Sequence, residues 1–154
     1  MLIFNQLIQE EGFDQEARYW LALCKWRDLK PQPAINDLKN LIEEVDSEEF
    51  MSRIYLSLGE IYLSIDNSED AYNNFNKGAN LSKNRLLREQ VYFQIAEISF
   101  ENSDFDNALE SYQKVLSNTV SITRIQDSNL KIVQIYRLRA VSYTHLRAHE
   151  TSYD

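Results

Sequence analysis

The chain has 154 residues, a net charge of −8, 3 glycines, 2 prolines and a single cysteine. This charge argues against nucleic acid and anionic membrane surfaces as partners, because both are bound through clustered Lys and Arg. One cysteine excludes an internal disulfide, and we expect Cys24 to pack as a small apolar side chain on a helix. No apolar run approaches the ~20 residues that a membrane span requires.

The first segment, residues 1–12, places its apolar residues on one helical face. These residues are Leu2, Ile3, Phe4, Leu7 and Ile8. We interpret the segment as a half-repeat, the second helix of a helical pair whose first helix is missing, with Met1 as an internal methionine. Gly12 is expected to end this helix, and Asp14 can cap the next one.

Residues 15–46 are predicted to form the first complete pair of helices. Pro31 and Pro33 mark the turn, since proline is tolerated in the first turn of a helix. Small and apolar residues recur at helical spacing on both sides of this turn. They are Ala17, Leu21, Ala22 and Cys24 before it, and Ala34, Ile35, Leu38, Leu41 and Ile42 after it.

The second pair, residues 52–85, is predicted to consist of helices at 53–64 and 69–81, and the third pair occupies residues 89–122. Positions of the second pair recur in the third thirty-seven residues later. They are Tyr55, Leu58, Gly59, Ala71 and Phe75, followed by Tyr92, Ile95, Ala96, Ala108 and Tyr112, whereas Ser99 replaces the aromatic expected one period after Tyr62. A fixed period of this size is typical of a solenoid, in which stacked pairs bury one another.

The end of the chain differs from the repeats. Residues 126–139 predict one further first helix, a second half-repeat. Residues 141–151 read VSYTHLRAHET, which resembles a translated transposase-type sequencing adapter. We therefore predict that residues 1–140 are a fragment of a longer bacterial protein and that 141–154 are an arbitrary or disordered tail. The spacing of His145 and His149 would suit a metal pair, but this interpretation is discarded with the tail.

The recurring residues resemble the tetratricopeptide repeat. The resemblance covers most of residues 1–139, with a weaker first repeat carried by Leu21, Ala22, Ala34 and Leu38. It implies an all-α fold, a right-handed α-solenoid of stacked helix-turn-helix repeats. The period of 37 exceeds the 34 usual for the family, and such long-period repeats resemble those of bacterial envelope proteins, namely the Tol-Pal coordinator and the outer-membrane assembly lipoprotein.

The resemblance also implies a concave groove lined by the first helices, in which a peptide lies. The side chains expected there are Tyr19, Leu23, Trp26, Arg27, Arg53, Leu56, Glu60, Leu63, Gln90, Phe93, Glu97 and Phe100. Aromatic anchors are typical of interface hot spots, and a basic residue of the partner would face Glu60 or Glu97. The alternative is that Phe93, Phe100 and Trp26 pack on neighbouring first helices. The Lys and Asn of the family's chaperone-binding clamp are replaced, for example by Leu56 and Phe93.

Catalysis has little support, because residues 1–140 lack histidine and a glycine-rich phosphate loop. We predict a non-catalytic protein–protein interaction scaffold that binds a partner peptide or helix. The alternative is a structural or self-assembly segment of a larger envelope protein. We expect no cofactor, metal, nucleic acid or small-molecule substrate, and localisation stays open between the bacterial cytoplasm and periplasm.

Overall fold

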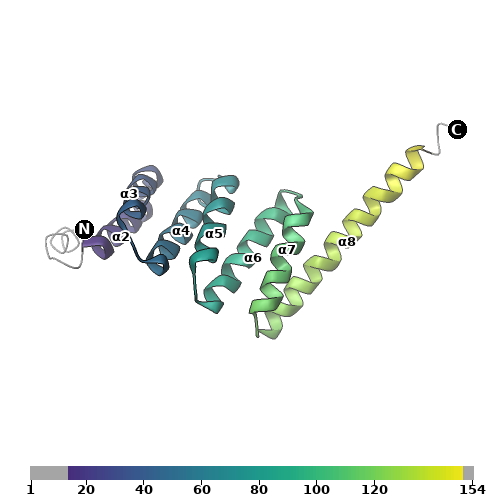
Figure 1. The fold of residues 1–154 in the computed structure, drawn as a ribbon. Coiled ribbons are helices and arrows are strands. Elements are labelled where there is room, and N and C mark those ends of the chain that lie inside the picture. Colours follow the sequence, from purple (N-terminus) through teal and green to yellow (C-terminus); the bar gives the residue numbers. More distant parts are fainter. Residues whose placement is uncertain (1–13, 151–154) are drawn as a thin grey trace. The chain divides into compact units, whose positions relative to one another are not determined.

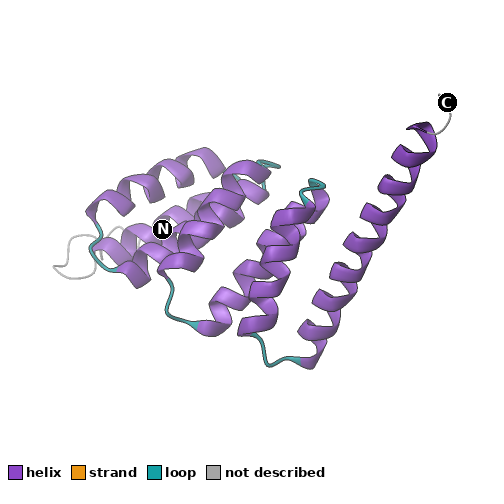
Figure 2. Ribbon diagram, turned by 45° about the vertical axis from the view of Figure 1, so that its right-hand side comes forward, coloured by secondary structure: helices purple, strands orange, loops and turns teal. Residues whose placement is uncertain are grey.

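The computed structural model describes residues 14–150, and the side chains of residues 14–143. The predicted half-repeat at residues 1–12 lies outside this range. The described residues form seven helices and no strand, which confirms the all-α prediction (Figures 1 and 2). The chain divides into two compact units, Met1–Val91 and Tyr92–Asp154.

Unit 1 contains two helical hairpins and the beginning of a further helix. The first hairpin is α2 (Asp14–Arg27) with α3 (Pro31–Glu44), and the second is α4 (Glu48–Leu63) with α5 (Ser68–Leu81). Helix α6 (Arg85–Glu101) starts in this unit. The second hairpin packs on the first through contacts of α4 with both α3 and α2 (Figure 1). The two hairpins therefore stack, as the period predicts.

Close approach of the two helices within the second hairpin depends on glycine. A Cβ on Gly59 of α4 would lie 2.6 Å from the ring of Phe75 on α5, and one on Gly78 would lie 2.6 Å from Leu56 Cδ2. Phe75 is 1% exposed, so its ring cannot move aside without disturbing the core. Glycine at residues 59 and 78 therefore allows the two helices of this hairpin to pack closely.

The turn inside each hairpin also recurs with the period. Leu29, Asp66 and Ser103 have φ angles of 59°, 57° and 61°. In each case the following residue donates its N–H to the carbonyl five residues before it, for example Lys30 to Lys25 at 3.0 Å. This is the Schellman pattern, which satisfies the last carbonyls of a helix and usually places glycine at the left-handed position. None of the three residues is glycine, so each turn carries some backbone strain.

Helix starts follow local capping chemistry. The side chains of Asn67 and Asp104, one period apart, accept hydrogen bonds from the N–H three residues on, at 3.2 and 3.3 Å. The corresponding Lys30 makes no cap, and Pro31 begins α3 instead. The predicted start of the second pair, at residue 53, is wrong, because Ser47 Oγ accepts from the N–H of Phe50 and α4 begins at Glu48.

Unit 2 comprises the rest of α6, α7 (Phe105–Asn118) and α8 (Ile122–Glu150). Its core joins all three helices, with the half-buried Phe93, Phe100, Phe105 and Ile132 packed around Ala96, Ala108, Leu109, Tyr112 and Ile135. Helix α8 continues through residues 141–150 without a break, so these residues are not disordered, whereas their adapter origin stays a prediction. No Gly or Pro occurs there to end the helix.

Candidate functional site

The first helices of unit 1, α2 and α4, lie side by side in equivalent register. Glu16 binds Arg53 through two hydrogen bonds of 2.8 and 3.1 Å, and the hydroxyl of Tyr19 lies 2.9 Å from Ser57 Oγ. Trp26 Nε1 donates to Ser64 Oγ at 3.0 Å. Each pair joins residues separated by 37 or 38 positions. Residues one period apart are therefore neighbours across this face.

Three residues expected to line the groove are used in packing instead. Tyr19 is 7% exposed and Leu56 is 8% exposed. Leu56 packs against Gly78 of α5, so it lies inside the second hairpin. The guanidinium of Arg53 lies 4.9 Å from the ring centre of Tyr19, in addition to its pairing with Glu16. Tyr19 and Leu56 therefore offer little surface to a partner, whereas Arg53 is partly exposed and already paired.

Five further expected residues on α2 and α4 remain accessible, and we call them the α2–α4 strip. They are Leu23, Trp26, Arg27, Glu60 and Leu63. Arg27 and Glu60 are exposed, whereas the three apolar members are half-buried. Leu23 lies one period before Glu60, and Trp26 one period before Leu63. Helix α2 thus contributes two apolar side chains and one positive charge to the strip. Helix α4 contributes one apolar side chain and one negative charge. Gln90, at the end of the unit on α6, is also exposed.

Glu60 is electrostatically unusual within the strip. Solvent reaches its side chain, yet the surrounding protein desolvates the carboxylate and raises its pKa above the ordinary value of 4.5. Within the described residues its carboxylate has no hydrogen bond or ion pair. A desolvated carboxylate without a hydrogen-bond donor is stabilised in its charged form by a nearby cation.

An apolar pocket beside the strip was not foreseen from the sequence. Trp26, Leu29, Pro31, Ser64 and Ile65 line a volume of about 290 Å³ at the hairpin turns. Leu29 is 90% exposed in its left-handed backbone conformation, and Ile65 is 40% exposed. The signal in the sequence is a large apolar residue at a turn position where glycine is usual.

In unit 2, the three expected groove residues face α8. Arg124 lies 4.0 Å from the ring centre of Phe93, and Lys131 lies 4.6 Å from that of Phe100. The carboxylate of Glu97 accepts from Lys131 Nζ at 2.9 Å and from the hydroxyl of Tyr112. Burial and this hydrogen bond raise the pKa of Tyr112. This is the packing on a neighbouring first helix that the alternative interpretation describes.

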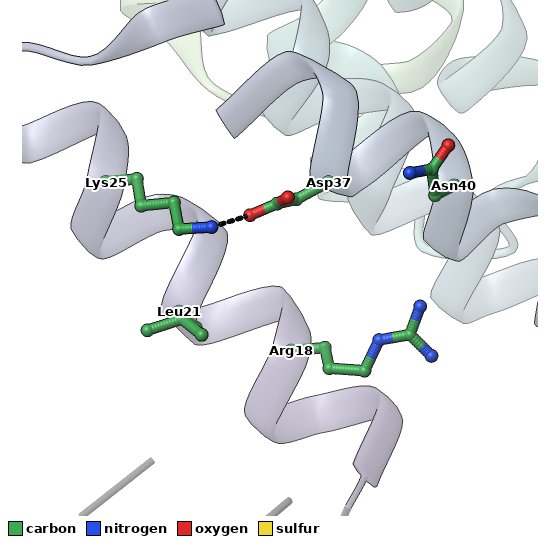
Figure 3. A pocket seen from close by; sticks show the side chains of 5 residues that line it. All are labelled: Arg18, Leu21, Lys25, Asp37 and Asn40. Carbon is green, nitrogen blue, oxygen red and sulfur yellow. Dashed lines mark hydrogen bonds and ion pairs between the residues drawn. The ribbon is translucent and has the colours of Figure 1, made fainter. Parts of the chain in front are cut away.

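The face of the first hairpin away from α4 and α5 carries a small polar pocket of about 210 Å³ (Figure 3). Lys25 Nζ donates to Asp37 across it at 2.5 Å. At its edge Arg18 binds Glu44, with Nη1 2.6 Å from Oε2, and this hydrogen bond raises the pKa of Arg18 and lowers that of Glu44. The charged groups of this pocket are therefore neutralised internally.

Metal-ligand side chains do not cluster among the residues that the structure describes. No group of three or more His, Cys, Asp or Glu side chains converges among them. Cys24 is half-buried rather than buried as expected. None of the helices that the structure describes is long and apolar enough to cross a membrane.

Comparison with known proteins identifies the architecture. Residues 52–85 and 89–118 match the family model of the tetratricopeptide repeat. Two crystal structures of MamA match at a TM-score of 0.66 each, with 18% and 20% identity; they cover 94% and 97% of this chain and 75% and 86% of their own. The Yersinia enterocolitica type III secretion chaperone SycD, solved with a peptide of the translocator YopD, matches at a TM-score of 0.60 and 16% identity, covering 88% of this chain and 98% of its own. No curated protein sequence matches the chain.

Proposed function

We propose that the chain, whose residues 52–85 and 89–118 match the model of the tetratricopeptide repeat, is a non-catalytic scaffold that binds a partner peptide or helix. The binding surface is the α2–α4 strip of unit 1. The family is generally non-catalytic, and the similar fold of SycD was solved with a bound peptide. The single observation that carries the proposal is Glu60, an unpaired carboxylate beside apolar side chains.

Comparison with unit 2 explains why Glu60 has no partner. Glu97, one period after Glu60, accepts hydrogen bonds from Tyr112 and Lys131. The residues one period before Tyr112 and Lys131 are Phe75, which has no hydroxyl, and Gln94, which has no charge. The equivalent carboxylate in unit 1 is therefore left for an external donor.

The partner segment should combine apolar side chains with a Lys or Arg. Leu23, Trp26 and Leu63 provide apolar contact area, and a basic residue placed opposite Glu60 restores the interaction that Glu97 makes internally. Aromatic and apolar anchors contribute most of the energy in such interfaces, whereas one exposed ion pair adds about 1 kcal/mol or less. Arg27 at the strip's end would favour an acidic or polar residue at one end of the segment.

Selection from a displayed peptide library against the full chain tests this proposal. The selected peptides should be apolar with a basic residue, and anisotropy of one labelled peptide should show about fivefold weaker binding to Glu60→Gln. Leu63→Ala should weaken binding at least as much. Glu101→Gln removes the same charge from an exposed position of α6 and serves as the control. Equal binding to the wild-type chain and to both strip variants would refute the proposal.

One observation favours the alternative function, a structural segment of a larger assembly. Helix α8 leaves Leu130, Val133 and Tyr136 exposed at 68%, 47% and 56%. Their spacing of three places them along one side of the helix, and an apolar stripe of this kind commonly packs against another helix. Light scattering can compare the oligomeric state of the wild type with that of a Leu130→Ser/Val133→Ser variant. A self-assembly role requires that the wild type forms an oligomer and that the variant does not.

A further inference from the structure

A second groove of unit 1 lies between α3 and α5, with α4 as its floor. It has a volume of about 420 Å³. Tyr55, Leu58 and Tyr62 of α4 line the floor, Ile42 of α3 lines one wall, and Lys77 of α5 lines the other. None of the residues that line this groove belongs to the α2–α4 strip, so the two surfaces are distinct.

Two lysines of this groove stand over tyrosine rings. Lys39 Nζ lies 5.6 Å from the ring centre of Tyr62, and Lys77 Nζ lies 5.5 Å from that of Tyr55. Neither ammonium group makes an ion pair with a carboxylate among the described residues. A cation over an aromatic face keeps most of its charge available, because the ring interaction contributes only about 1 kcal/mol at exposed sites.

The groove also contains two carboxylates, and neither neutralises these lysines by direct contact. Asp70 accepts a hydrogen bond from Asn67 Nδ2 at 2.8 Å in the first turn of α5, and it acts on Lys39 only at longer range. Glu43 is exposed on α3 and makes no ion pair with Lys39, although the two are one helical turn apart.

The third pair has a lysine at the position equivalent to Lys77, and the charge of that lysine is already neutralised. Lys114 stands over Tyr92, one period after the pair formed by Lys77 and Tyr55, but it also binds Glu110 at 2.7 Å. The residue one period before Glu110 is Asn73, so Lys77 lacks this carboxylate.

The polar pocket of the first hairpin also differs from the α3–α5 groove in the pairing of its charges. Its five lining residues, Arg18, Leu21, Lys25, Asp37 and Asn40, lie one period before five lining residues of the groove. There, the ion pairs of Arg18 with Glu44 and of Lys25 with Asp37 neutralise the cations. Only the α3–α5 groove, among these three described sites, presents cations without a bound carboxylate.

We propose that the α3–α5 groove is a second binding site for an acidic peptide segment, whose carboxylates bind Lys39 and Lys77 while an apolar or aromatic side chain packs against Tyr55. Charge complementarity selects this occupant, because the chain's other described ammonium groups over aromatic rings, those of Lys114 and Lys131, already bind a carboxylate. The tyrosine floor gives an apolar side chain a flat aromatic surface. The two sites of unit 1 therefore differ in the charge they prefer: basic at the strip, acidic in the groove.

The experiment uses the full chain and a displayed library of capped peptides, followed by anisotropy with one labelled acidic peptide from the selection. Lys39→Gln and Lys77→Gln should each weaken its binding about fivefold, and the double variant about twentyfold or more. The matched control is Lys30→Gln/Lys83→Gln, which removes the same charge from exposed positions of unit 1 and should leave affinity unchanged. Glu60→Gln, which tests the strip, should also leave it unchanged, so the two proposals fail independently.

Amide chemical shifts of the wild-type chain give a second measurement that needs no variant. The acidic peptide should shift amides of α3 and α5, and raising the salt concentration should reverse the shifts because the charges are exposed. The proposal is overturned if the selection shows no acidic preference, if the groove variants bind as the control does, or if sodium acetate alone reproduces the shifts at the same concentration.

Discussion

Replacing Gly59 by alanine tests whether the second hairpin depends on close helix contact. In an exposed helix this change stabilises by about 1 kcal/mol, because alanine loses less backbone entropy than glycine. Here the new Cβ would lie 2.6 Å from two ring carbons of Phe75 and 2.9 Å from a third. Contacts under 3 Å force the ring or the helix to move.

The cost of that movement should exceed the gain. Overpacking a well-packed core costs about 1–3 kcal/mol, and Phe75 is 1% exposed with no free space to enter. The net destabilisation is then about 1 kcal/mol, with a range from near zero to about 2 kcal/mol. For a chain of this size, 1 kcal/mol corresponds to about 2–4 °C in Tm.

A double-mutant cycle with Phe75→Leu separates overpacking from other effects. Phe75→Leu alone should cost about 1 kcal/mol or more through lost contacts, whereas Gly59→Ala should become neutral or stabilising in that background. Chemical denaturation followed by circular dichroism gives the four free energies of unfolding. If Gly59→Ala stabilises the wild-type chain, or destabilises both backgrounds equally, the proposed contact does not limit the hairpin.

Three further outcomes follow from the same geometry. Leu29→Gly should raise stability by about 1 kcal/mol in denaturation, because a left-handed, exposed leucine is replaced by the residue that suits the turn; unchanged stability would contradict the strain. An NMR titration should place the pKa of Glu60 above 4.5, so its contribution to stability is present at acidic pH and is lost as pH rises through that pKa. Phe75→Tyr should lower this pKa by supplying a hydroxyl that donates to the Glu60 carboxylate. Phe93→Ala and Phe100→Ala should each lower the stability of unit 2 by about 1–3 kcal/mol, whereas unaffected melting with lost peptide binding would show that they form a binding surface.

The architecture could be predicted from the sequence because it rests on residue size at fixed intervals. Gly59 opposite Phe75, and Ala96 opposite Tyr112, recur one period apart, and only stacked helical hairpins bury such a pattern. The residues at which helices begin were predicted less accurately. The cap at Ser47 requires a specific backbone geometry that no periodic signal reports, so α4 was predicted five residues too short at its start.

The side chains facing outward were harder to assign, because helical period alone does not determine which neighbour covers a position. Leu56 shares a helix with Glu60, one turn away, yet Gly78 leaves a hollow on α5 that Leu56 fills. Similarly, Phe93 and Phe100 are covered by Arg124 and Lys131 of α8. Whether these two rings are exposed depends on cations about thirty residues later in the chain. The repeat pattern does not mark those cations.

Residues that differ between equivalent positions of the repeats indicate where a partner binds better than residues that recur do. The repeat register places a carboxylate at residues 60 and 97 and a lysine at residues 77 and 114. In unit 2 each of these charges binds a neighbour supplied by the same unit, Lys131 for the carboxylate and Glu110 for the lysine. One period earlier, Gln94 stands in place of Lys131, Phe75 in place of Tyr112 and Asn73 in place of Glu110. None of these residues carries the charge or hydroxyl of its counterpart, so we expect binding partners at Glu60 and Lys77 of unit 1 rather than at Glu97 and Lys114 of unit 2.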